Sequence, residues 1–273
     1  MAEDAPYINQ PLVLALVELR HPRAPLTPGE LAGIEQALQK TAPIYRSEVE
    51  HLGSFTVDAL SGDSDMRHQS APLHRFITRD RKTSVTFRTE AMSLETVAYP
   101  GWTAFLALLR KVLTVRQDIA PVLGVTRIGL RYIDQIRVPG ECPPDWSQWI
   151  TKSLPAPRFD GELAMSVEQQ QCAVQYSLDD LGQALTFRYG QAVGPSIAPV
   201  SFADQPGGAQ PAETGPYFLL DSDASWTLPV DDPLEDVDID TVVAVADQLH
   251  GPSLALFEAV IQPKLRDEVF NRA

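Results

Sequence analysis

Two halves of this 273-residue chain predict the same succession of secondary-structure elements. In the first half, the expected elements cover 12–20 (strand), 27–43 (helix), 48–60, 73–80, 83–89 and 91–98 (strands) and 102–113 (helix). In the second half, they cover 125–138 (strand), 145–153 (helix), 161–169, 171–178, 184–189 and 217–228 (strands) and 238–271 (helix). Each half therefore has the order β-α-β-β-β-β-α. This order predicts an α+β fold with antiparallel sheets, divided into 1–124 and 125–273.

Local signals define where several of these elements begin and end. The apolar run that starts at Leu12 is short and β-rich, as expected of a buried strand. The stretch 27–30, Thr-Pro-Gly-Glu, combines a helix N-cap, a first-turn proline and an acidic third residue. Gly251-Pro252 predicts a kink or a break in the final helix. Residues 195–216 form a proline-, glycine- and alanine-rich insertion, whose order the sequence does not determine.

The repeated order resembles the helix-grip half-domain of the TATA-binding-protein fold. That resemblance implies a pseudo-duplicated arrangement in which a curved antiparallel sheet carries its helices on one side. It rests on the order of elements, because the two halves share no repeat at the level of residues.

Four stretches resemble a sporadically distributed bacterial family of uncharacterised proteins. They are Pro11-Leu12-Val13 with Glu18-Leu19-Arg20, Tyr99-Pro100-Gly101-Trp102 with Phe105, the run 127–134 (RIGLRYID), and Leu249-His250 with Phe257-Glu258. The resemblance spans nearly the whole chain and implies no established function. The scattered occurrence of the family implies a defence, toxin-antitoxin or mobile-element context. The insertion before Tyr217 has no counterpart in it.

Charge and composition exclude several classes of protein. The net charge is −14, and 189–263 contains neither Lys nor Arg, so the composition argues against direct nucleic-acid binding. The two cysteines, Cys142 and Cys172, are too few and too far apart for a zinc ribbon or a redox pair. No apolar run is long enough to span a membrane, and the first residues lack the features of a secretory signal. We therefore expect a cytoplasmic protein.

The sharpest candidate for ligand binding is a pair of arginines around a glycine. Strand alternation places Arg127, Gly129 and Arg131 on one face and Tyr132 on the other. Two guanidinium groups suit a carboxylate or phosphate, and the glycine would admit a ligand or another backbone. The alternative is that these arginines pair with internal acids such as Asp221 and Asp223, because a mostly buried arginine needs a partner.

The aromatic candidates have two interpretations as well. Tyr132 and Trp102 are the aromatic candidates for ligand binding. Trp102 alternatively caps the core at a strand-to-helix corner, because the Pro100-Gly101 pair before it supplies turn geometry. For His250, hydrogen bonding in the core is favoured over catalysis. The five histidines have no metal-binding spacing, and the motifs of serine hydrolases, P-loops and dinucleotide sites are absent, so the sequence predicts no metal, cofactor or catalytic residue.

The remaining candidate is an acidic segment around Pro229 and Pro233. Asp231, Asp232, Glu235 and Asp236 predict either a solvated loop that leads into the last helix or a docking surface for a basic protein. Our first hypothesis is therefore a non-enzymatic binding or regulatory protein that neutralises a toxin or nuclease. The second is a pocket between sheet and helix that binds a small anion or carries an enzymatic activity. A homodimer stays open as one way to protect the edge strands.

Overall fold

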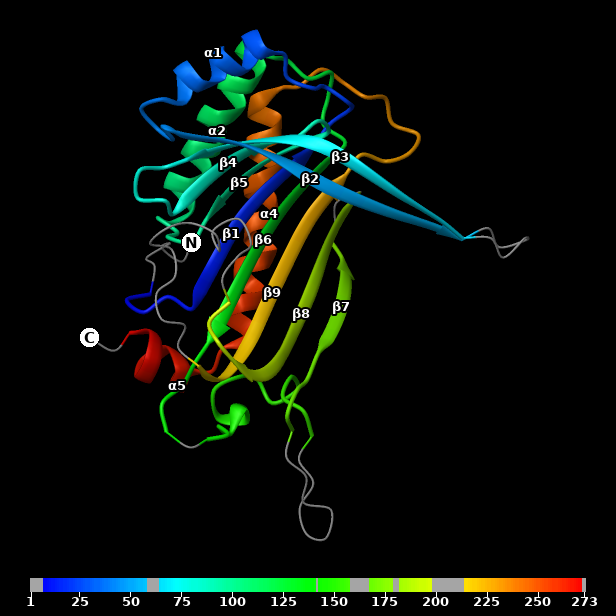
Figure 1. The fold of residues 1–273 in the computed structure, drawn as a ribbon. Coiled ribbons are helices and arrows are strands. Elements are labelled where there is room, and N and C mark those ends of the chain that lie inside the picture. Colours follow the sequence, from blue (N-terminus) through cyan, green and yellow to red (C-terminus); the bar gives the residue numbers. More distant parts are fainter. Residues whose placement is uncertain are drawn as a thin grey trace.

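The computed structural model is an α+β protein built on one antiparallel sheet of nine strands (Figure 1). It describes residues 7–57, 64–140, 142–157, 167–178, 182–197 and 214–271, without the side chains of 51–57 and 64–69. The strand order is β2-β3-β4-β5-β1-β6-β9-β8-β7. No helix in this part of the chain has the length and apolar character needed to cross a membrane.

The first half supplies five strands and two helices. Their bounds are β1 Leu12–Arg20, α1 Pro28–Leu38, β2 Ile44–Val57, β3 Ser64–Ile77, β4 Thr83–Phe87, β5 Ala91–Thr96 and α2 Trp102–Ile119. The predicted capping box of α1 is confirmed, because Thr27 and Glu30 exchange hydrogen bonds between side chain and backbone.

The second half departs from the prediction at both of its helices. Its elements are β6 Arg127–Ile136, η1 Trp146–Gln148, β7 Cys172–Ser177, β8 Gln183–Gly194, β9 Gly215–Thr227, α4 Ile239–Val260, α5 Pro263–Leu265 and η3 Arg266–Phe270. The helix expected at 145–153 is wrong: only the single 3-10 turn η1 forms. Most of the strand expected at 161–169 and most of the insertion at 195–216 lie outside the described residues, and the described part of the former, 167–169, is not in a strand.

The final helix is shorter than predicted and does not break where expected. Helix α4 runs through Pro252 and ends at Val260, and Ile261 is extended and forms a β-bridge with Ile150. Pro263 disfavours a helical conformation at the residue before it, so the chain restarts as α5 only at Pro263.

The two halves meet in the middle of the sheet. Within each half the first strand pairs with the last, β1 with β5 and β6 with β9, and β1 also pairs with β6. The predicted boundary at 124/125 falls between α2 and β6, so both halves contribute to one continuous sheet.

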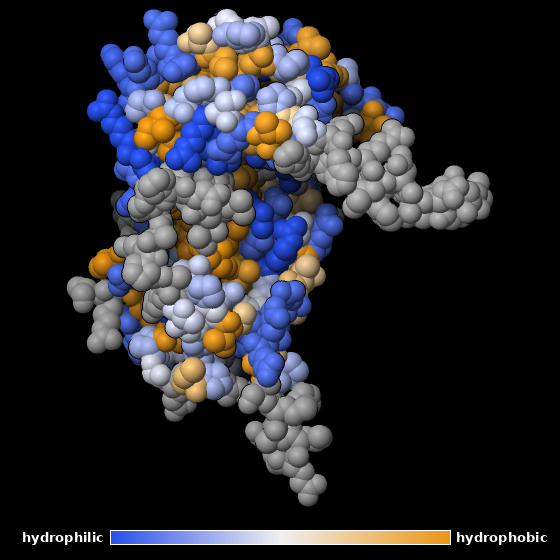
Figure 2. Space-filling model, viewed as in Figure 1, coloured by the Kyte–Doolittle hydropathy of each residue, from blue (hydrophilic) through white to orange (hydrophobic). Residues whose placement is uncertain are grey.

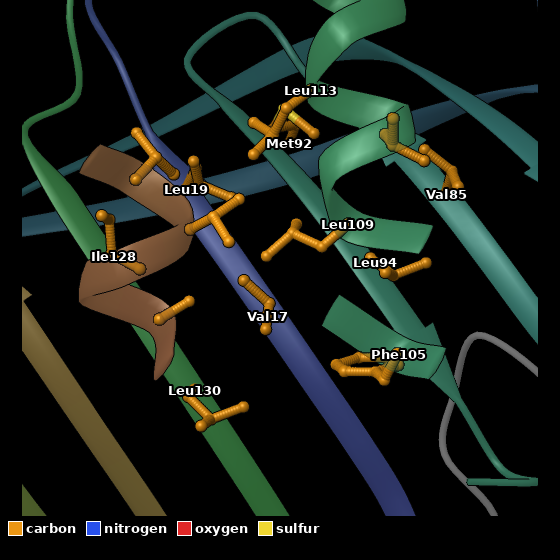
Figure 3. Close-up of a cluster of buried hydrophobic side chains, with 14 of the residues drawn as sticks. Val17, Leu19, Val85, Met92, Leu94, Phe105, Leu109, Leu113, Ile128 and Leu130 are labelled. Atoms are coloured by element: carbon orange, nitrogen blue, oxygen red, sulfur yellow. The ribbon is translucent and has the colours of Figure 1, made fainter. Parts of the chain in front are cut away.

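Helices α1, α2 and α4 lie on one face of this sheet (Figure 1). Figure 3 shows Val17, Leu19 and Leu130 of the central strands pointing towards Phe105 and Leu109 of α2. One core cluster extends through both halves, from Phe76 and Leu94 to Leu185 and Ala224, with the α4 residues from Val242 to Leu249. A second cluster, around Trp146, Phe218 and Phe270, lies near the end of α4. None of the described helices lies on the opposite face, here called the helix-free face.

Candidate functional site

The predicted arginines lie on the helix-free face at the centre of the sheet. Ile128, Leu130 and Tyr132 of β6 are buried in the core beneath the helices, so the alternate residues Arg127 and Arg131 point the other way. This face is hollowed below the β2–β3 hairpin and contains hydrophilic side chains (Figure 2).

Arg131 forms a bidentate ion pair on this face. Its Nε and Nη2 groups donate to Oδ1 and Oδ2 of Asp221 at 2.8 and 2.7 Å. The Asp221 side chain is 5% exposed and that of Arg131 39%. Donating these two hydrogen bonds to Asp221 raises the pKa of Arg131, which stabilises the charged guanidinium. Arg188 approaches the same carboxylate, with Nη1 3.6 Å from Oδ2.

Arg127 is held by two carboxylates and fills the space beside the glycine. Its Nη2 donates to Oδ1 of Asp223 at 3.3 Å, and its Nη1 lies 3.8 Å from Oε1 of Glu18. A Cβ atom on Gly129 would lie 2.5 Å from Nη1 of Arg127, so the guanidinium lies directly over the glycine. The predicted alternative, in which Arg127 and Arg131 pair with Asp223 and Asp221, is therefore confirmed. The gap at Gly129 holds the chain's own arginine.

The same pattern continues into the first half. Arg88 contacts Glu50 at 3.2 Å and Arg75 contacts Glu48 at 3.6 Å, while Ser84 donates to the buried Glu95 at 2.8 Å. We call these side chains, together with the pairs around Arg127 and Arg131, the ion-pair band. Because its arginines lie beside carboxylates, the band presents mixed charge rather than one positive field.

The aromatic candidates lie on the opposite face of the sheet, against α4. Trp102 is 5% exposed, and its Nε1–H donates to Oδ1 of Asp247 at 2.6 Å. Its ring stacks on His250 with centroids 4.3 Å apart, and the Tyr132 hydroxyl lies 3.0 Å from Nδ1 of His250. Gly101, which precedes α2, has φ +94, a conformation that favours glycine at this corner. The core interpretations of Trp102 and His250 thus match the contacts, and the four ligand-binding candidates do not form one site.

Sequence reasoning missed a buried carboxyl on this inner face. Asp134 of β6 is 7% exposed, and its side chain forms no hydrogen bond with any described residue. Burial, and then the nearby charge of Asp221, raise the pKa of Asp134 to about 8. Strand alternation was the available signal, because it places Asp134 on the same face as Leu130 and Tyr132.

A buried pair of basic side chains was also missed. His21 and Arg116 are both buried, and the amide of His21 donates to the carbonyl of Glu90 at 3.0 Å. Nη2 of Arg116 donates to the carbonyl of Ala24 at 3.2 Å. Burial lowers the pKa of His21, so its neutral form is favoured.

The four acidic candidates lie together on one exposed loop. Asp231, Asp232, Glu235 and Asp236 are all exposed, and none forms an ion pair with any described residue. The loop follows β9 and leads to Asp238, whose carboxylate accepts from the amides of Asp240 and Thr241 at the start of α4.

Apolar side chains are exposed beside these carboxylates. Val230 is fully exposed, Leu234 is 40% exposed, and Leu123 on the adjoining segment is 72% exposed. A Cβ atom on Gly124 would lie 2.6 Å from Leu234, so the loop packs directly on the chain before β6. We call these residues and the four carboxylates the acidic loop surface.

No group of three or more possible metal ligands occurs among the described residues. No protein-family model matches this chain, and the search of curated proteins gives no match to it.

Proposed function

We propose that this chain is a non-enzymatic binding or regulatory protein that engages a basic protein through the acidic loop surface. The observation that carries the proposal is the set of four exposed carboxylates, Asp231, Asp232, Glu235 and Asp236, without ion pairs in the described part of the chain. The arginines of the other candidate site are already opposed by carboxylates of their own.

The chemistry of the acidic loop surface defines the partner. Four carboxylates attract lysines and arginines over a distance of about 10 Å, and they accelerate association at low salt. The exposed side chains of Val230, Leu234 and Leu123 add apolar area, which charge alone does not supply. The expected partner surface therefore carries basic residues around an apolar centre.

The proposal includes the cellular setting expected from the sequence. The protein acts in the cytoplasm as the neutralising partner of a basic toxin or nuclease, in the defence or toxin-antitoxin context that the family resemblance implies. Direct nucleic-acid binding is not part of it, because the net charge of −14 opposes a polyanion.

We also propose that the fold is a pseudo-duplicated helix-grip arrangement. Two observations support it: the helices share one face, and the first strand of each half pairs with the last. Duplication is compatible with a binding role, since the second half is free to acquire a loop that the first half lacks.

A second candidate function is the binding of a small anion. The observation that favours it is that Arg131 and Arg188 share the single carboxylate of Asp221, and both guanidinium groups remain partly exposed. The anion would bind on the helix-free face and not between sheet and helix. Calorimetric titration with inorganic phosphate tests this function, and heat that persists unchanged in Arg188→Ala would contradict it.

The acidic loop surface is tested by neutralising its charge. The variant carries Asp231→Asn, Asp232→Asn, Glu235→Gln and Asp236→Asn, and the matched control carries Glu35→Gln, Asp118→Asn, Asp267→Asn and Glu268→Gln at exposed positions elsewhere. Wild type and both variants are used as bait in host lysate at low and moderate salt.

We expect one basic protein, in stoichiometric amount, on the wild type and the control and not on the loop variant. Its association rate with the wild type should fall as salt rises. A basic protein that binds all three baits equally, or the absence of any such protein, would refute the proposal.

A further inference from the structure

Strand β2 leaves one edge of the sheet open. It is 14 residues long and pairs only with β3, from Ile44↔Ile77 to Val57↔Ser64. Within 44–50, where the side chains are described, no backbone group bonds to anything besides β3. Among the described residues, the outer edge of 44–50 is therefore open to pairing.

The outer part of this hairpin has little support from the rest of the sheet. Strand β3 pairs with β4 only over His74–Ile77, so the hairpin beyond these pairs is two-stranded. Figure 1 shows it extending past the other strands. A two-stranded ribbon is marginal in water, and a strand paired along 44–50 would add a third strand at its base, over 48–50.

Two positive charges face each other across the β2–β3 ladder. Arg46 lies directly opposite Arg75 in the β2–β3 ladder, and Glu48 contacts Arg75. Arg46 forms no ion pair with any described residue. Like charges opposite one another destabilise a ladder, so a carboxylate from outside would be favourable beside Arg46. On the other side of the strand Val49 is 61% exposed.

We propose that a second copy of this chain pairs antiparallel along β2, with Ser47 facing Ser47 of the partner subunit. This register brings Arg46 opposite Glu48 of the partner subunit, and it brings Val49 opposite Tyr45 of the partner subunit. Two-fold symmetry repeats both contacts, giving two ion pairs on one face and two apolar pairs on the other. The two nine-stranded sheets then form one continuous sheet.

The opposite edge of the sheet does not offer this complementarity. Strand β7, Cys172–Ser177, has the sequence CAVQYS and carries no charged side chain. A β7 strand facing its own copy would form no ion pair. The self-complementary charges therefore favour β2.

Light scattering coupled to size-exclusion chromatography, over a range of protein concentrations, tests the pairing. The wild type should have twice the mass of one chain. Either Arg46→Glu or Glu48→Arg places like charges opposite one another twice, and should raise the dimer Kd at least about tenfold. The double variant exchanges the two charges and should restore dimerisation. The control Val174→Lys, on β7, should leave the dimer unchanged.

Thermal unfolding of each variant shows whether it is folded, because Glu48→Arg also removes the contact with Arg75. Four results would overturn the proposal. They are a monomeric wild type at all concentrations, a dimer that tolerates both single reversals, a double variant that stays monomeric although folded, and a dimer lost with Val174→Lys.

Discussion

Replacing Asp134 by asparagine should change stability in a way that depends on pH. The pKa of this buried carboxyl rises from its usual 3.8 to about 8 in the folded protein, mainly because burial disfavours the charge. Since the folded-state pKa is raised, its contribution to stability is fully present below pH 3.8 and is lost as the pH rises towards 8. Asparagine keeps the shape and removes the titration.

The magnitude follows from the two pKa values. Keeping the proton on Asp134 at pH 7, while the unfolded chain ionises, costs about 1.4 kcal/mol per pH unit above 3.8, or about 4 kcal/mol. At pH 4.5 the same calculation gives about 1 kcal/mol. The buried amide of Asp134→Asn adds a destabilising offset of about 1–3 kcal/mol, which is the same at both pH values. Relative to the wild type, the variant should therefore gain about 3 kcal/mol between pH 4.5 and pH 7.

Urea unfolding at the two pH values, followed by tryptophan fluorescence, measures this difference. Asp118→Asn is the matched control, because this exposed carboxyl on α2 should give the same difference from wild type at both values. If the difference between Asp134→Asn and wild type is equal at pH 4.5 and pH 7, Asp134 is ionised in the folded protein and the reasoning is refuted.

Three further substitutions test the contacts. Arg131→Ala leaves the buried Asp221 without its bidentate partner, and should lower the free energy of unfolding by about 2–3 kcal/mol in a folded protein. A free energy of unfolding equal to that of the wild type, measured by chemical denaturation, would contradict a structural role. Gly129→Ala displaces the Arg127 guanidinium and should lower the free energy of unfolding by about 1 kcal/mol in the wild type, but by much less in Arg127→Ala. Equal losses in the two backgrounds of this double-mutant cycle would contradict the contact. Trp102→Phe removes one buried hydrogen bond but keeps an aromatic ring, and should lower the free energy of unfolding by about 1 kcal/mol; a Tm equal to that of the wild type would count against it.

Patterns within one segment predicted most of the fold. The strand at β1, the capped start of α1 and the stripe of α2 each depend on a single periodicity or cap, and all three are confirmed. The helix expected at 145–153 failed because Trp146, Trp149 and Ile150 are buried in the second core cluster, where tertiary packing overrides local preference. The overlong final helix failed because one extended residue, Ile261, makes a bridge to a distant segment.

The sequence predicted on which face of its strand each candidate residue lies, but not which residues are its neighbours. Alternation correctly separated Arg127 and Arg131 from Tyr132. Pairing with Asp221 and Asp223 was foreseen only as an alternative, because it depends on β9 lying next to β6 in a fixed register. Strand order and register are properties of the whole sheet, so the periodicity of one segment does not contain them.

The central position of β1 has a consequence for how the chain is made. This strand is synthesised first, yet one of its two neighbours is β6, which starts only at Arg127. At roughly 5–20 residues per second, the ribosome leaves the β6-facing edge of β1 open for on the order of ten seconds. The first half therefore emerges as an incomplete sheet with an exposed edge. We expect that a chaperone, or fast synthesis of the second half, would reduce aggregation at that edge.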